Sequence, residues 1–212
     1  MSKPSDFFMG VLDFFAILLP GAISTAILAP RLGCYLLGPL VSVPTSEAEN
    51  WAAFLICTYF IGHLIFLVGS NVDRLCDSLR ERLSPCENEE AYQCAKLIRN
   101  SLINVSERKA LKTFQWSRSV LIAKCPAAAE DVHRLEADSK FFRSLIVVCA
   151  LASLVFLASG RFVEGIVALA LILPCFVRYY ERRIKSNTQA YIHVITLYRL
   201  GTVSAPSNQD IG

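Results

Sequence analysis

The stretch SLIVVCALASLVFLASG (Ser144–Gly160), followed after Arg161 by FVEGIVALALILPCFVRYY (Phe162–Tyr180), decides the class of this protein. A helix rises about 1.5 Å per residue, so roughly 20 apolar residues are needed to cross a hydrocarbon core of about 30 Å. As one helix, the two runs together would be too long for a single crossing. Gly-Arg is a suitable break, and the sequence therefore predicts a tight hairpin of two membrane-spanning helices.

Two earlier runs are also long and apolar enough to cross. One is WAAFLICTYFIGHLIFLVGS (Trp51–Ser70), and the other begins near Phe7 or Phe14 and continues through FFAILLPGAISTAILAP to Pro30. The run that ends at Pro30 starts beside acidic residues and lacks a clear small-residue cleavage site, so we expect it to be a retained span and not a signal peptide. Residues 34–43 are apolar but too few to cross, which favours an interfacial, re-entrant or periplasmic piece.

Composition agrees with a membrane protein. Hydrophobic residues make up 54% of the chain and charged residues only 18%, compared with about 25% in a typical soluble domain. The net charge is +3, and residues 71–142 hold 12 Lys/Arg against 11 Asp/Glu. Such balanced charge is unlike the dense basic face of a nucleic-acid-binding domain, so no nucleic-acid partner is expected.

The basic residues also predict the orientation in the membrane. The connections 31–50 and 160–161 each contain one arginine, whereas the central segment and the tail are rich in Lys and Arg. Cytoplasmic loops carry the excess of basic residues. We therefore expect an all-α, multi-pass protein of the cell inner membrane, with four transmembrane helices, a cytoplasmic helical bundle and both termini in the cytoplasm.

The predicted layout has four parts. They are residues 1–70 with two spans and a short periplasmic loop, a cytoplasmic helical subdomain at 71–142, a transmembrane hairpin at 143–180, and an amphipathic cytoplasmic tail at 181–212.

Residues 71–142 are predicted to be helical. Span two continues outward as a helix to Ser84-Pro85, a second helix covers 88–105, and a third covers 107–123 with Ser106 as its N-cap. A fourth helix begins at Pro126 and enters the membrane as span three without a break. The apolar stripes of these helices predict a small bundle, and the alternative is a surface for a partner protein or a sister subunit.

Two further predictions concern the membrane surface. Trp116 lies on a different side of its helix from the neighbouring apolar residues, which suggests an indole at the membrane interface. The tail begins with basic residues that would lie beside acidic lipid headgroups.

Asp13 and His63 are ionisable residues within or beside spans one and two. Such side chains cost about 2.5 kcal/mol or more at mid-bilayer, so each needs a reason. With both termini cytoplasmic, the two residues fall at similar depth and are predicted to form an intramembrane polar pair. One interpretation is a structural clamp between two helices. The other is a proton or ion site, since imidazole titrates near neutral pH.

Helix kinks are predicted at Pro20-Gly21 in span one and at Pro174 in span four. Small residues recur in spans three and four, where they allow close packing of helices within the hairpin or between protomers.

Motifs for catalysis, cofactors or metals are lacking. The chain has eight cysteines without a C-x-x-C pair, three histidines, and no G-x-S-x-G, H-E-x-x-H or phosphate-binding loop. Asp73 and Asp77 lie four residues apart on one predicted helix, a pairing common on solvated surfaces. The sequence therefore predicts a protein that is not an enzyme and has no catalytic, cofactor or metal site.

Three motifs carry a family resemblance: D-F-F-A-x-L-L-P-G (Asp13–Gly21), Y-x-I-G-H (Tyr59–His63) and E-A-D-S-K-F-F-R (Glu136–Arg143). They resemble small four-span bacterial membrane proteins of uncharacterised function, some found beside anti-phage genes. In size and layout the chain is similar to the membrane subunit of the Kiwa defence system. The resemblance implies a role in anti-phage defence and supplies no active-site residue.

Two functions remain open from the sequence. The first is a homo-oligomeric, non-enzymatic effector or sensor that couples a cytoplasmic signal or protein partner to the lipid bilayer. The second is an ion channel or proton-coupled transport subunit that uses Asp13 and His63.

Overall fold

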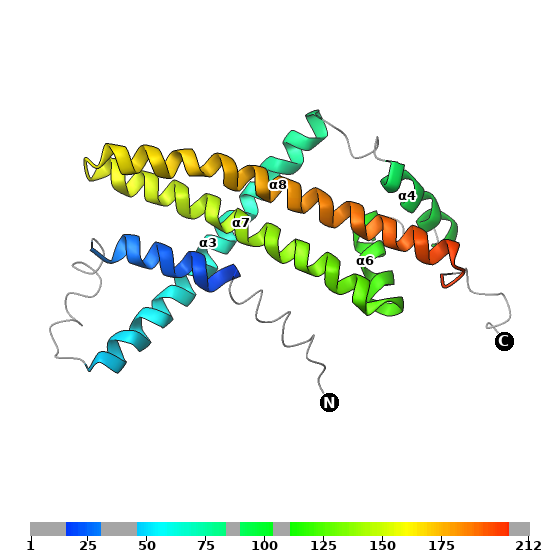
Figure 1. The fold of residues 1–212 in the computed structure, drawn as a ribbon, viewed down its shortest axis with the longest axis horizontal. Helices are drawn as coiled ribbons and strands as arrows, with labels where there is room; N and C mark the ends of the chain where they lie inside the picture. The colour runs from blue at the N-terminus through cyan, green and yellow to red at the C-terminus, as the bar shows by residue number, and fades with distance from the viewer. Residues whose placement is uncertain (1–15, 31–45, 84–89, 104–110, 204–212) are drawn as a thin grey trace. The chain divides into compact units, whose positions relative to one another are not determined.

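A computed structural model describes residues 16–30, 46–83, 90–103 and 111–203, and every regular element in those ranges is an α-helix (Figure 1). The all-α class is confirmed for this part of the chain. Six helices are present there: Ala16–Pro30, which is unlabelled in the figure, α3 (Glu47–Leu83), α4 (Glu90–Leu102), α6 (Thr113–Lys124), α7 (Pro126–Ala158) and α8 (Phe162–Arg199).

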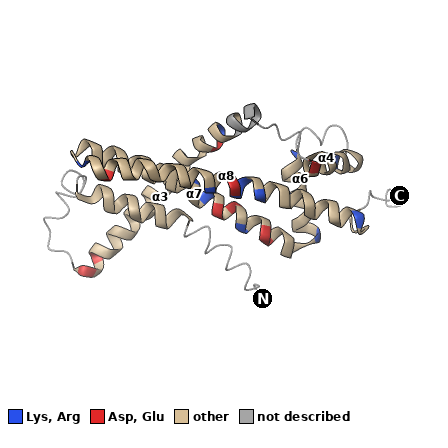
Figure 2. Cartoon of the chain, turned by 45° about the horizontal axis from the view of Figure 1, so that its top comes forward, with Lys and Arg blue, Asp and Glu red and all other residues tan. Residues whose placement is uncertain are grey.

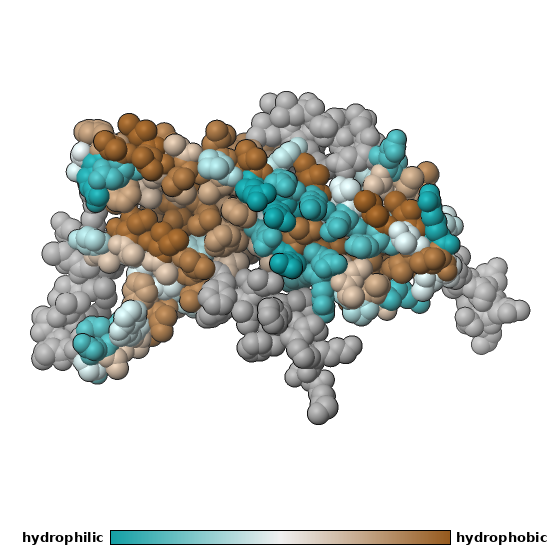
Figure 3. All heavy atoms as spheres, viewed as in Figure 1, coloured by the Kyte–Doolittle hydropathy of each residue, from teal (hydrophilic) through white to brown (hydrophobic). Residues whose placement is uncertain are grey.

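Three of these helices, α3, α7 and α8, are long and apolar enough to cross a membrane. Their most apolar windows are only 22%, 33% and 17% buried, respectively. Figure 3 shows the resulting hydrophobic surface on the α7–α8 hairpin. Because exposed apolar surface of this extent is stable in lipid and not in water, the chain is suited to a membrane location.

The predicted break at Gly160-Arg161 is present, and a tight turn joins α7 to α8 there. Gly160 has φ +73° and follows the end of α7. Its N–H donates to the Leu157 carbonyl, and the Arg161 N–H donates to the Phe156 carbonyl, both at 3.0 Å. This pair of bonds satisfies the last carbonyls of α7 and requires a left-handed residue at position 160, which glycine adopts without steric cost.

The three long helices extend well beyond their apolar segments. Helix α3 continues past Ser70 to Leu83, and α7 begins at Pro126 and passes unbroken into the apolar run, as the sequence predicted. Helix α8 continues from the apolar run to Arg199, so residues 181–199 of the predicted tail belong to the same helix as that run. Figure 2 shows that charged residues gather on the early part of α7 and the middle of α8.

The helix Ala16–Pro30 is shorter than a complete span. The expected start of span one, at Phe7 or Phe14, lies outside the described residues, as do residues 34–43. The fourth span therefore stays a prediction.

The chain divides into two compact units. Unit 1 comprises Met1–Cys76 and Ala137–Glu181, and unit 2 comprises Asp77–Glu136 and Arg182–Gly212. The tail thus groups with the central segment in unit 2.

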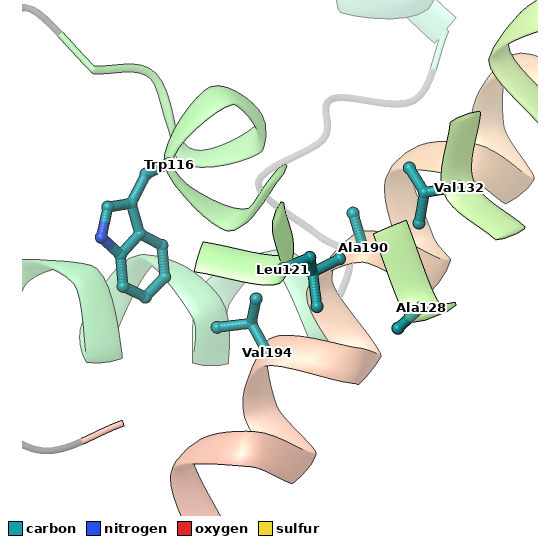
Figure 4. Close-up of a cluster of buried hydrophobic side chains, with 6 residues drawn as sticks. All are labelled: Trp116, Leu121, Ala128, Val132, Ala190 and Val194. Atoms are coloured by element: carbon teal, nitrogen blue, oxygen red, sulfur yellow. The ribbon is translucent and has the colours of Figure 1, made fainter. Parts of the chain in front are cut away.

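The core of unit 2 is formed by α6, α7 and α8 (Figure 4). Leu121, Val132 and Val194 are fully buried in it, and Trp116 is 6% exposed. The predicted place of Trp116 at the membrane surface is therefore wrong. Its indole packs in a core that includes α8, a neighbour that the periodicity of one helix does not reveal.

The third predicted helix begins later than expected. Leu111 and Lys112 are not helical, and α6 starts at Thr113, with Lys112 extended at its N-terminus. The Gln115 side chain accepts a hydrogen bond from the Lys112 N–H, which caps the helix at this point. The expected N-cap, Ser106, lies outside the described residues.

Candidate functional site

A polar cluster joins three helices of unit 1 where their apolar segments end. Asp73 comes from α3, Arg143 from α7 and Tyr179 from α8. Arg143 Nη1 donates to Asp73 Oδ2 in an ion pair, and the Tyr179 hydroxyl donates to Asp73 Oδ1 at 2.6 Å. Each of the three helices that are suited to cross a membrane therefore contributes one polar side chain to a shared contact.

The ion pair is largely shielded from solvent. The side chain of Arg143 is 7% exposed and that of Asp73 is 23% exposed. The Arg143 guanidinium carbon lies 4.5 Å from the ring centroid of Phe66, which precedes Asp73 by about two helical turns in the apolar run of α3. A buried arginine is stable only when it is paired, and the aromatic face adds a favourable cation–π contact.

Gly69 makes room for the arginine. A Cβ atom added there would lie 3.2 Å from Arg143 Nε and 3.4 Å from its Cγ, closer than most real contacts of this kind. The arginine stem therefore lies directly across the backbone of α3. Small side chains at such crossings allow helices in membranes to approach closely.

Apolar residues pack beside the cluster and reduce its contact with solvent. Cys76, Ile146 and the Tyr179 ring form a buried core, with Tyr179 only 1% exposed. A charge clamp of this kind holds α3, α7 and α8 in one register, because removing either charge would leave the other buried without its partner.

The predicted polar pair, Asp13 with His63, remains a prediction. His63 is exposed on α3, and its ring makes an edge-on contact with Tyr59, with the ring centroids 4.5 Å apart. Asp13 lies outside the described residues. On the described part of the chain, His63 therefore faces outward and not into the packed helices of unit 1.

The predicted kink positions lie inside continuous helices. Pro20 and Gly21 belong to Ala16–Pro30, and Pro174 belongs to α8. Gly21 has a further role that the sequence did not reveal. A Cβ atom there would lie 2.9 Å from the Gly62 nitrogen of α3, so the two backbones cross at a pair of glycines.

From the sequence, Asp73 is predicted to lie on a solvated surface, and Arg143 stands out only as the last residue of the motif E-A-D-S-K-F-F-R. The positions of the cluster residues in the sequence nevertheless indicate that their side chains can meet. Asp73, Arg143 and Tyr179 each lie near the cytoplasmic end predicted for a span, on three different spans. Residues at the same predicted depth can meet, and a carboxylate, a guanidinium and a phenol are complementary groups.

Within the described ranges no group of three or more His, Cys, Asp or Glu side chains is arranged to hold a metal ion. Among the small residues of the two hairpin helices, Ala152, Ser153 and Ala168 are buried. Comparison of the chain with protein-family models, with curated proteins and with solved structures found no match.

Proposed function

We propose that this protein is a non-enzymatic membrane effector or sensor subunit that couples events in the bilayer to a cytoplasmic partner or signal. One observation carries the proposal: α3, α7 and α8 each continue as a single helix from an apolar, lipid-suited segment into a second, compact unit. A continuous helix is a stiff rod, so a tilt or rotation of its apolar half moves its other half as well.

The proposed topology has four spans, with both termini and unit 2 in the cytoplasm of a cell with an inner membrane. The distribution of Lys and Arg supports it. Fusions of alkaline phosphatase and green fluorescent protein to either end provide the test. Fluorescence at both ends, without phosphatase activity, is the expected result.

Unit 2 carries exposed apolar side chains that a protein partner or a second copy of the chain would cover. Leu97, Ile122 and Leu200 are 67%, 59% and 73% exposed. Side chains of this size on a compact unit favour a binding surface over a purely solvated one. A homo-oligomer is proposed for the same reason, and because the exposed His63 would gain polar contacts at a helix–helix interface in the membrane.

Coupling can be tested by hydrogen exchange in vesicles. The protein is reconstituted in thin bilayers of short-chain phosphatidylcholine and in thick bilayers of long-chain phosphatidylcholine, which change the tilt of spanning helices. We expect the backbone amides of α4 and α6 to exchange at different rates in the two bilayers. Equal rates in both would contradict the proposal.

A matched pair of variants tests whether helix continuity transmits the change. Arg74, Ser78, Glu181 and Lys185 are exposed on α3 and α8 near the ends of their apolar segments. All four are replaced by glycine in one variant and by alanine in the other. Glycine costs about 1 kcal/mol more than alanine at each helical position. The lipid effect should persist in the alanine variant and diminish in the glycine variant; equal responses would count against transmission through the helices.

Transport is the second candidate, and the exposed His63 favours it, because an ionisable side chain on a lipid-suited helix needs a polar partner or a water path. Proton and ion flux into liposomes is measured for wild type, His63→Ala and Asp13→Asn. Flux that both substitutions abolish, in folded protein, would favour transport over the effector role.

We further propose a role in anti-phage defence, which is what the family resemblance implies. Bacteria expressing the chain are challenged with a panel of phages. A reduced plating efficiency that the quadruple glycine variant loses and the alanine variant keeps would support the role.

A further inference from the structure

One edge of the Arg143 guanidinium lacks a hydrogen-bond acceptor. Nη1 donates to Asp73, whereas Nε and Nη2 are buried and have no hydrogen-bond partner among the described residues. In arginine, Nε–H and one Nη2–H point in parallel from the same side of the group and form the fork that binds a carboxylate or phosphate through two bonds. The Arg143 side chain is 7% exposed, so bulk water does not satisfy these donors.

The described acids near this edge have other donors. Asp73 accepts from Arg143 on one oxygen and from Tyr179 on the other, and Glu181 accepts from Arg178 at 2.8 Å. No described side chain serves as the acceptor for the fork, and a bound oxyanion has the chemistry that the fork requires.

The position of the cluster indicates the source of this oxyanion. Arg143 directly precedes the apolar run of α7, and Asp73 and Tyr179 lie where the apolar runs of α3 and α8 end. The phosphate groups of a bilayer lie at such a boundary, just outside the hydrocarbon core. On the apolar side of the cluster, Leu67 and Val177 are 66% and 55% exposed, so acyl chains attached to a phosphate there would cover apolar surface.

We propose that the Nε–Nη2 edge of Arg143 binds the phosphate of a phospholipid headgroup, with one phosphate oxygen accepting from each nitrogen. Asp73 keeps its bond to Nη1, so the guanidinium joins the lipid to the ion pair that holds the helices together. Exposed Arg74, next to Asp73, adds positive charge at the same level, which favours an anion there.

Because the fork is covered in the structure, a side chain must move when the phosphate binds. The Phe66 ring lies 4.5 Å from the guanidinium carbon and is partly exposed on α3. This ring turns about two side-chain torsions, whereas the main chain at Gly69, which the arginine stem crosses, cannot turn aside. We therefore expect Phe66 to move, and its cation–π contact to be replaced by two charge-assisted hydrogen bonds.

Lipid titration of the full chain in neutral detergent micelles tests the site. The midpoint of thermal unfolding is measured with phosphatidylglycerol, with diacylglycerol of the same acyl chains, which lacks the phosphate, and with inorganic phosphate. We expect phosphatidylglycerol to raise the midpoint of wild type by roughly 5 °C, and the other two compounds to change it much less. An equal rise with diacylglycerol or with inorganic phosphate would overturn the assignment to a lipid phosphate.

Three variants assign the effect to the fork. Arg143→Lys keeps the positive charge beside Asp73 but lacks the fork, so the rise with phosphatidylglycerol should be much smaller than in wild type. Gly69→Ala keeps every group of the cluster and places a methyl group 3.2 Å from Nε, so it should also weaken the effect. Arg178→Lys is the control, because this arginine is 52% exposed and is bonded to Glu181, and it should keep the full effect.

An undiminished rise in Arg143→Lys would overturn the proposal, and so would a loss in Arg178→Lys as large as that in Arg143→Lys. If the lysine variant does not fold, an undiminished rise in Gly69→Ala overturns it instead. None of these midpoints depends on how unit 2 responds to bilayer thickness, so the lipid site and the proposed function can fail independently.

Discussion

Asp73, at the residue scale, is held by two side chains that are 70 and 106 positions away in the sequence. Its carboxylate accepts from Arg143 on one oxygen and from Tyr179 on the other. A lone carboxylate beside a membrane span is ordinarily explained by hydration at the interface. Here the hydrogen bonds from Arg143 and Tyr179 stabilise the charge instead, and the carboxylate is less exposed than most surface acids.

Tyr179→Phe should destabilise the protein without disturbing its packing. The substitution removes only the hydroxyl that donates to Asp73, and a hydrogen bond to a charged group contributes about 1.5 kcal/mol or more. Unfolding by heat in detergent should show the loss. Tyr180→Phe is the control, because its ring stacks on Phe176 at 6.5 Å and the ring is unchanged. Equal stability of Tyr179→Phe and wild type would show that the bond contributes nothing.

In unit 2, Arg99 links two helices through hydrogen bonds, as Arg143 does in unit 1. Its Nη1 donates to the Leu111 carbonyl at 3.0 Å and to Thr113 Oγ1 at 3.1 Å, which binds α4 to the start of α6. Arg99 Nη2 also donates to Asn100 Oδ1 at 3.1 Å, and Arg99→Lys replaces these two donor nitrogens by one, so it should lower the free energy of unfolding by about 1–3 kcal/mol. Arg118→Lys, at an arginine that is 38% exposed, should change it little. Hydrogen exchange localised to α4 and α6 distinguishes the two variants, and similar exchange in both would contradict this role.

At the scale of elements, the first helix and α3 depend on a close approach of their backbones. Gly21 and Gly62 face each other there, and a side chain on either would meet main-chain atoms of the opposite helix. Main-chain atoms cannot turn aside as a flexible side chain can, so the two helices would have to separate.

Gly62→Ala should therefore lower the free energy of unfolding by about 1–3 kcal/mol. Gly165→Ala is the matched control in α8, since its added Cβ would lie 2.7 Å from the Leu157 side chain and 3.3 Å from the nearest main-chain atom, compared with 2.4 Å from main chain at Gly62. At position 165 the higher helix propensity of alanine, about 1 kcal/mol, offsets the free-energy cost of displacing the Leu157 side chain. Denaturation in mixed micelles measures both, and a Gly165→Ala effect as large as that of Gly62→Ala would refute the distinction.

For the whole molecule, the apolar surfaces of α3, α7 and α8 determine the environment in which the chain is stable. Leu154, Val163 and Leu173 are 68%, 73% and 69% exposed. Transfer of such surface from lipid to water costs roughly 25 cal/mol per Å². The fold of unit 1 is thus stable only where lipid or detergent covers these residues.

The expressed chain should sediment with membranes and stay there after alkaline carbonate treatment, which releases peripheral proteins. Non-ionic detergent should solubilise it. A truncation that ends after Leu83 is the comparison, since it keeps α3 and removes α7 and α8, and it should also stay in the pellet. Release of the full chain by carbonate would contradict a membrane-spanning arrangement.

The predictions from sequence differ in outcome for physical reasons. The start of α7 at Pro126, the break at Gly160 and the long apolar helices were predictable, because each depends on residues that are close together in the sequence. The start of α6 at Thr113 and the burial of Trp116 were not, because the first depends on a side-chain cap and the second on α8. In the unit 2 part of α8, Ala190, Tyr191 and Val194 are buried, whereas Tyr198 is 40% exposed.

The sequence alone determined that this protein is all-α and suited to a membrane, because the length and hydropathy of a helix are properties of consecutive residues. Only the tertiary structure decided that Arg143 lies between Asp73 and Phe66, and that His63 faces outward on the described helices. Those contacts depend on the rotation of each helix about its axis. The packing of small residues and charges on neighbouring helices sets that rotation, and one helix's own sequence does not specify it.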